Sequence, residues 1–98
     1  MKTLEYKGKK ISNAVSALAI YYPLISNGGD YLKDAKKSEI TSMLYLYTAC
    51  RMAADKEARK LPAEEIMNEV DYEELSDPKS EFIKVFNELF GKGDGKNV

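Results

Sequence analysis

The side chains that most often perform acid-base or metal chemistry are scarce in this sequence. Among its 98 residues there is no histidine and a single cysteine, Cys50. Without histidine the chain lacks the commonest general base and the commonest neutral metal ligand. One thiol alone cannot form an ordinary zinc site, a Cys-His nucleophile pair or an intrachain disulfide. We therefore expect no catalytic residue, no metal and no cofactor, and we expect that the protein is not an enzyme.

Two further stretches come close to ligand-binding motifs without completing them. Residues 91–96 are rich in glycine and lysine like a phosphate-binding loop, but the spacing is one residue short and Asn97 stands where that motif needs serine or threonine. We therefore predict a flexible tail over residues 92–98. The acidic region 63–81 lacks the order of acids and glycine that wraps calcium, so a solvated acidic face is the preferred interpretation. An enzyme using paired carboxylates there is the least favoured alternative.

Charge is unevenly distributed along the chain. Region 63–81 carries eight acidic residues and one lysine, a local charge of about −7, whereas the net charge of the whole chain is −1. Nucleic-acid-binding domains usually have isoelectric points above about 9, and the value here is near 5.5. We therefore expect no nucleic-acid partner. The 44% hydrophobic content indicates a folded core, which leaves contacts with another protein, or pairing within the chain, as roles for these charges.

The sequence also contains no segment typical of a targeting signal or a membrane span. Its longest stretch almost free of charge, residues 11–29, is interrupted by Pro23 and by two glycines. No signal-like apolar run follows the N-terminus. Together with the single cysteine, these features predict a protein that stays in the reducing cytoplasm and has no membrane partner.

Hydrophobic spacing predicts a mainly α fold of about four helices, to which a short N-terminal β-hairpin can be added. The alternation over residues 3–6 and the following glycine-containing turn favour that hairpin. Helical spacing of apolar residues follows, from Ile11 through Val15 and onward, and Pro23 is expected to stop or kink this helix near Tyr22.

Three further helices are expected after the Asn-Gly-Gly-Asp turn. The longest covers residues 39–56, a shorter one runs from Pro62 to about Val70, and the last begins near Ser76 or Asp77 and stops at Gly91. Residues 1–91 are therefore predicted to form a single helical domain.

The predicted long helix has apolar residues on more than one side. Tyr45 and Met52 are seven residues apart and lie well over 90° from the centre of its main stripe. Such a helix is either packed by its own chain on two sides or covered by a partner on the second. Because tyrosine and methionine suit protein interfaces, we name Tyr45 and Met52 as candidate partner-binding residues. The main stripe, in which we expect a buried Cys50, consists of Ile40, Met43, Leu44, Tyr47, Cys50 and Ala54.

The order of these segments resembles one known protein family. The run Leu-Glu-Tyr-Lys-Gly-Lys-Lys-Ile at 4–11 is similar to the family's short hairpin around a Gly-Lys turn, and residues 40–51 are similar to its central helix. The run Leu-Pro-Ala-Glu-Glu-Ile at 61–66 looks like the acidic start of the helix that follows, and residues 82–91 look like the closing helix. Across roughly residues 3–91, the chain resembles the tail assembly chaperones of long-tailed bacteriophages.

This resemblance implies a phage or prophage tail assembly chaperone. Such a protein binds the tape-measure protein noncovalently, in the cytoplasm of the bacterial host, and keeps it soluble until tail subunits assemble around it. The resemblance brings no catalytic residues, and it implies that a longer, frameshifted form can exist. The alternative is a self-associating structural or regulatory helical module, and hence a homo-oligomer, because the long helix has a second apolar side.

Overall fold

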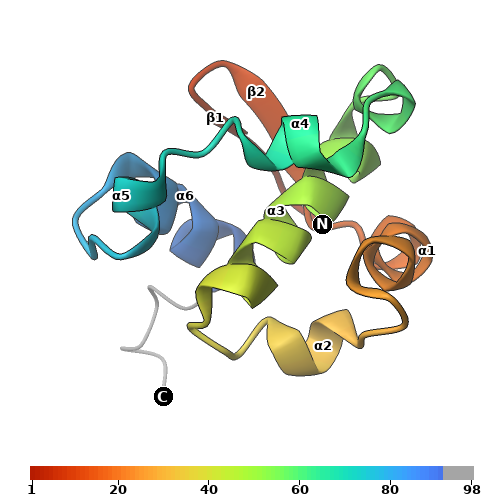
Figure 1. Ribbon diagram of the computed structural model, residues 1–98, viewed down its shortest axis with the longest axis horizontal. Coiled ribbons are helices and arrows are strands. Elements are labelled where there is room, and N and C mark those ends of the chain that lie inside the picture. Colours follow the sequence, from red (N-terminus) through yellow and green to blue (C-terminus); the bar gives the residue numbers. More distant parts are fainter. Residues whose placement is uncertain (92–98) are drawn as a thin grey trace.

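The computed structural model describes residues 1–91 and begins with a β-hairpin (Figure 1). Both turn residues, Lys7 and Gly8, have positive φ angles of 51° and 82°. Two-residue turns of this kind follow the natural twist of the strands, so the expected hairpin is confirmed. The tail predicted over residues 92–98 lies outside the described residues. The antiparallel strands are β1 (Thr3–Tyr6) and β2 (Lys9–Ser12), paired so that Thr3 lies opposite Ser12 and Tyr6 opposite Lys9.

The first helix, α1 (Val15–Ser26), runs through its proline. Of the two expected outcomes near Tyr22, a stop or a kink, the stop is therefore wrong. Pro23 lies in the last turn of the helix, where its missing N–H removes a single helical hydrogen bond. The helix ends only at Asn27, which adopts a φ of 59°, and the next N–H, from Gly28, donates to the Pro23 carbonyl at 2.7 Å. This left-handed C-cap fixes the end of the helix.

Helix α3 (Ile40–Ala54) runs through the middle of the fold (Figure 1). It agrees with the predicted long helix to within two residues at each end. Helix α1 packs along one side of α3, and β2 and α4 pack elsewhere around it. The sequence left two interpretations of the apolar pattern of this helix, and the structure agrees with the first of them, packing by the chain's own elements on two sides. The buried apolar residues of α3 are Met43, Leu46, Tyr47, Ala49 and Cys50, which confirms the predicted burial of Cys50.

Shorter helices complete a mainly α fold, with six α-helices in residues 1–91 instead of about four. The two extra helices are single turns, α2 (Tyr31–Asp34) and α5 (Tyr72–Leu75). Helix α2 is too short to show helical periodicity in the sequence, and the Asp30 carboxylate caps it by accepting from the Leu32 N–H at 2.9 Å. None of the helices in this described part of the chain is both long and apolar enough to cross a membrane.

The boundaries of the last two predicted helices also differ from expectation. Helix α4 (Ala63–Met67) ends three residues before Val70. Helix α6 (Glu81–Phe90) starts later than Ser76 or Asp77 because Ser80 is its N-cap, with the Ser80 hydroxyl accepting from the Ile83 N–H at 3.2 Å. A 3-10 turn, η1 (Ala58–Lys60), joins α3 to α4.

Buried tyrosines connect the core to the acidic residues. Three of the seven tyrosines are 0% exposed, and a phenol buried this deeply needs a hydrogen-bond partner. In each case a carboxylate accepts from the hydroxyl, so the core is held together by charge-assisted hydrogen bonds as well as by apolar packing. The pairs are Tyr6 with Glu74 (2.7 Å), Tyr22 with Asp34, and Tyr47 with Glu69 (2.6 Å).

Candidate protein-binding site

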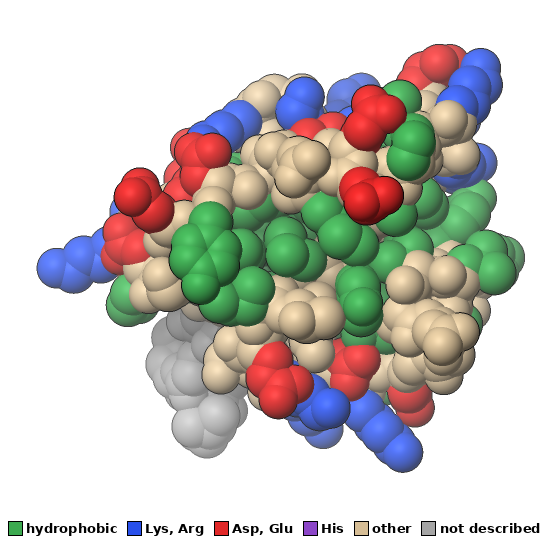
Figure 2. All heavy atoms as spheres, in the orientation of Figure 1, with side chains coloured by type: hydrophobic (Ala, Val, Ile, Leu, Met, Phe, Trp, Pro, Cys, Tyr) green, Lys and Arg blue, Asp and Glu red, His purple; other side chains and the backbone are tan. Residues whose placement is uncertain are grey.

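A shallow apolar groove lies on the face formed by α3, α4 and α5. Its volume is about 320 Å³, and Tyr72 on its edge is 72% exposed. Figure 2 shows hydrophobic side chains gathered in a band across this face, with acidic side chains on both flanks of the band. Apolar depressions with polar rims are typical of sites that bind apolar parts of other molecules. The groove is lined by Leu44, Glu64, Met67, Asn68, Val70, Tyr72 and Leu75.

A hydrogen-bonded network fixes the α4 side of the groove to the core. The Glu69 carboxylate accepts from the Tyr47 hydroxyl at 2.6 Å and from the Arg51 Nε at 2.9 Å. The Arg51 Nη1 also donates to the Lys10 carbonyl in β2 at 3.1 Å. One oxygen of Glu69 thus joins the segment after α4 to α3, and Arg51 extends the connection to the hairpin.

The titration behaviour of this network follows from its burial and its charges. Burial and the hydrogen bond to Glu69 raise the pKa of Tyr47 well above its usual value. Burial alone would lower the pKa of Arg51, but the hydrogen bond and charge of Glu69 leave it above its usual value. The Tyr47 phenol therefore stays neutral and the Arg51 guanidinium stays charged throughout the physiological pH range.

A second carboxylate, Glu74, fixes α5 on the opposite side of the groove. Its Oε2 accepts from the Tyr6 hydroxyl at 2.7 Å and from the Lys7 Nζ at 2.6 Å. Its Oε1 accepts from the Phe82 N–H at 3.0 Å, in the first turn of α6. Burial opposes ionisation of Glu74, but the bonds from Lys7, Tyr6 and Phe82 hold the pKa of its carboxyl below the usual range. Helix α5, which carries Tyr72, is thus held in place by the hairpin turn.

These contacts correct the interpretation of region 63–81 as a solvated acidic face. Glu69 and Glu74 turn inward, where each accepts hydrogen bonds from a buried tyrosine and a cation. Sequence patterning missed both anchors because their partners, such as Tyr6 and Tyr47, are distant in sequence. These two acids pair with cations of the same chain, which was one of the two roles considered for the charges from the sequence.

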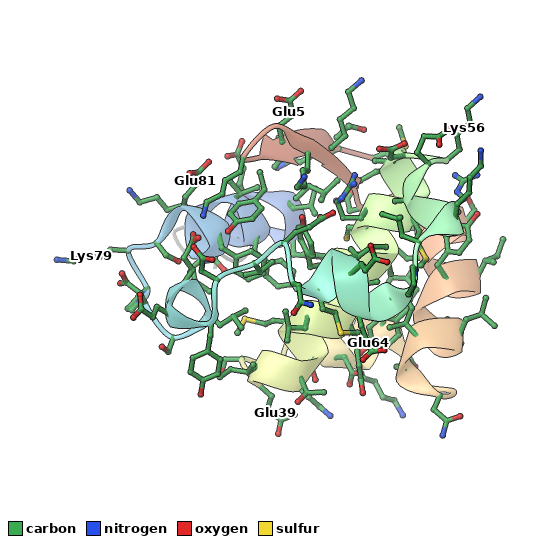
Figure 3. All side chains as sticks on the ribbon, turned by 45° about the horizontal axis from the view of Figure 1, so that its top comes forward. Glu5, Glu39, Lys56, Glu64, Lys79 and Glu81 are labelled. Atoms are coloured by element: carbon green, nitrogen blue, oxygen red, sulfur yellow. The ribbon has the colours of Figure 1, made fainter. Side chains whose placement is uncertain are left out.

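The other acids of this region remain on the surface, and one of them, Glu64, lines the groove. Glu64, Glu65 and Glu73 are exposed, and none of them forms an ion pair with a residue in 1–91. In Figure 3, Glu64 lies near the centre of the view beside α4, whereas Lys79 and Glu81 project from the far end of the molecule. An apolar segment with a basic residue one turn away would match this combination of groove and unpaired carboxylates.

The two residues named from the sequence, Tyr45 and Met52, do not line this groove. Both are half-buried and pack against the core. The Tyr45 ring meets the Tyr22 ring of α1 edge-on, with centroids 6.4 Å apart. Near Met52, the Arg59 Nε donates to its carbonyl at 2.7 Å. Tyr45 therefore lies at the boundary with α1, and the role of both residues in partner binding stays a prediction.

Two other hollows border the same elements. A hollow of about 370 Å³ lies between α3, α5 and α6 and shares Leu75 with the groove, so α5 forms the ridge between them. A more polar hollow of about 460 Å³ lies under the hairpin turn and is lined by Lys9, Lys10 and Arg51 among others. Because Arg51 is already paired with Glu69 and Asp55, this hollow offers less unsatisfied charge than its lysines suggest.

The single cysteine is buried, and the described part of the chain holds no cluster of metal ligands. Cys50 is 0% exposed, and burial raises the pKa of its thiol far above the usual value. No group of three or more acidic, cysteine or histidine side chains within residues 1–91 is arranged to hold a metal ion.

Comparison with protein-family models, with characterised proteins and with solved structures finds no match to this chain. The groove, its rim and its supporting contacts are therefore the features of this chain that bear on its function. Sequence analysis did place Leu44 on an apolar face and Met67 in a helix, but it did not join them to Tyr72. The available signal was an aromatic residue, Tyr72, in the middle of the most acidic stretch of the chain.

Proposed function

We propose that this protein is a phage or prophage tail assembly chaperone that binds the tape-measure protein noncovalently in the bacterial cytoplasm. The observation that supports this most directly is the groove between α3, α4 and α5, with the exposed Tyr72 on its edge. A long helical client exposes apolar stripes that aggregate before assembly, and a small domain can cover part of such a stripe by accepting its side chains in a groove.

The volume of the groove limits what enters it. About 320 Å³ accommodates one or two large apolar side chains, far less than a whole helix. We therefore expect the client helix to lie across the face and to insert anchors from adjacent turns, three or four residues apart. Tyr72 supplies an amphipathic ring that can cover these anchors while its hydroxyl stays in water.

The unpaired acids beside the groove define the second property of the client. Glu64 is part of the groove lining, and Glu65 and Glu73 are exposed nearby in sequence. Carboxylates in this position favour a client with lysine or arginine beside its apolar anchors, and they accelerate encounter with it at low salt. They also oppose aggregation of the chaperone through its own apolar face.

Co-expression with the tape-measure protein from the same genome tests this proposal. The wild-type chain should keep that client in the soluble fraction, and the substitution Tyr72→Ala should reduce the soluble amount. Leu32→Ala is the matched control, because Leu32 is also a largely exposed apolar residue (63%) but lies on α2 and does not line the groove. A client that stays equally soluble without this chain would contradict the proposal.

A further inference from the structure

The hollow under the hairpin turn collects positive charge on a chain whose net charge is −1. Three lysines, Lys9, Lys10 and Lys56, line it, and none of them forms an ion pair within residues 1–91. Two of these lysines belong to β2, and the third follows the end of α3, on the side of the molecule away from Lys79 (Figure 3). The hollow measures about 460 Å³, within the roughly 300–1,000 Å³ typical of small-molecule pockets. None of its lining residues lines the groove.

Arg51 brings a fixed guanidinium to the wall of this hollow. Its side chain is only 7% exposed, and its Nε donates to Glu69 at 2.9 Å. Its Nη1 donates to the Lys10 carbonyl at 3.1 Å and to Asp55 at 3.4 Å. The remaining nitrogen, Nη2, donates to no atom of residues 1–91 and is not fully enclosed. Its two N–H groups are therefore free to bind an acceptor in the hollow, and the fixed orientation lowers the entropic cost of that bond.

The hollow stays positive after the acids around it are counted. Asp55 is the one acid among the described residues that line it, and Glu69 contacts Arg51 from outside the lining. The three lysines and Arg51 supply four positive charges and these two acids supply two negative ones, which leaves a charge of +2. The carbonyl end of α3 would repel an anion, but the Arg59 Nε partly neutralises it by donating to the Met52 carbonyl at 2.7 Å.

We propose that this hollow binds a small anion that carries a phosphate group. The charge of a phosphate dianion matches that of the hollow, and its oxygens can accept from donors on β2 and on α3 at the same time. Lysine binds phosphate as a point charge, whereas a carboxylate is best bound by a two-nitrogen fork, and here only the Nη2 of Arg51 is free. The volume of the hollow leaves room for an organic group beside the phosphate.

The lining of the hollow distinguishes this ligand from larger partners. None of the large exposed apolar residues in the described chain lines it, whereas the centre of a protein interface is usually apolar. The same lack of apolar anchors disfavours a membrane surface. Two exposed acids interrupt the positive charge beyond the hollow, since Glu5 lies opposite Lys10 in the hairpin and Glu57 follows Lys56. No extended basic stripe is therefore available here for a nucleic acid.

An amide NMR titration with inorganic phosphate tests this site directly. The ionic strength is held constant with sodium chloride, so that general screening does not change during the titration. The amide signals of Gly8, Lys10 and Asp55, which line the hollow, should shift in a saturable way. Those of Met67 and Val70, which line the groove, should stay in place.

A double variant of the lysines shows whether the hollow itself binds phosphate. Lys10→Gln combined with Lys56→Gln should weaken phosphate binding by about tenfold or more, because two charge-assisted contacts are lost while the buried Arg51 is kept. Lys33→Gln combined with Lys84→Gln is the matched control, since both lysines are exposed and neither lines the hollow. The two double variants lose the same charge, so long-range attraction alone would weaken binding equally in both.

Three results would overturn this inference. The first is a wild-type chain without saturable shifts at the hollow, or with shifts that sodium chloride alone reproduces. The second is equal phosphate binding by the two double variants. The third is a hexaglutamate peptide that binds the hollow more tightly than phosphate does, since an acidic protein segment would then be its ligand. None of these results would bear on client binding by the groove, which the Tyr72→Ala variant tests separately.

Discussion

The hydroxyl of Tyr47 offers a sensitive test of how the groove is supported. It is buried and donates to the Glu69 carboxylate at 2.6 Å, beside the Arg51 ion pair. The substitution Tyr47→Phe removes this oxygen while keeping the ring, which contacts Tyr6 at 5.8 Å between centroids. The change therefore isolates one hydrogen bond from the surrounding aromatic packing.

The size of the effect follows from the kind of bond that is lost. Hydrogen bonds to charged groups contribute about 1.5–3 kcal/mol, and the lower half of this range applies here because Glu69 keeps Arg51 as a partner. A loss of about 2 kcal/mol lowers the melting temperature of a domain of this size by roughly 8–16 °C. Urea and thermal unfolding followed by circular dichroism would measure both quantities.

Tyr31 provides a matched control for the same chemical change. Its hydroxyl is buried but has no hydrogen-bond partner within residues 1–91. Removing an unsatisfied polar atom relieves a desolvation penalty, so Tyr31→Phe should leave the free energy of unfolding unchanged or raise it by up to about 1 kcal/mol. Equal losses in Tyr31→Phe and Tyr47→Phe, or no loss in Tyr47→Phe, would refute the role assigned to the Glu69 network.

Three further predictions concern titration and reactivity. The pKa of Glu74 is depressed in the folded state, so the stabilisation from this group should be complete above about pH 4.5 and lost as the pH falls below it; Glu74→Gln should flatten that part of a urea-midpoint profile. Burial and Glu74 raise the pKa of Tyr6 to about 12, so stability should fall between pH 10 and 12, and less so in Tyr6→Phe. Cys50 should resist a thiol reagent such as Ellman's reagent at pH 8 until urea unfolds the chain, and rapid labelling of the native protein would contradict its complete burial.

Local signals in the sequence were sufficient for the regular elements. The Lys7-Gly8 turn and the spacing of apolar residues in α3 both reflect contacts or dihedral preferences within a few residues. The effect of Pro23 on α1 was overestimated, because the energetic cost of a proline depends on its position in the helix and is small in the last turn. The end of α1 is set instead by the left-handed C-cap at Asn27. Helix α2 was missed because a single capped turn has no periodicity to detect.

The groove could not be predicted in this way because its parts come from distant segments. The groove brings together Leu44, Met67 and Tyr72 from three helices. The contact of Glu69 with α3 and that of Glu74 with the hairpin hold these helices in place. Pairings over such sequence distances leave no periodic signal in one sequence. The exposure of Val15 was equally hidden, since it shares helical spacing with the buried Leu18 and Tyr22 but is 67% exposed in the first turn of α1.

The central claim is that the groove beside Tyr72 binds an apolar, basic segment of the tape-measure protein. Fluorescence anisotropy with labelled helical segments of that protein measures this most directly. We predict saturable binding that weakens with added salt, at least about tenfold weaker binding by Tyr72→Ala, and unchanged binding by Leu32→Ala. Binding by Tyr72→Ala that equals the wild type, or no binding of any segment to the wild-type chain, would contradict the claim.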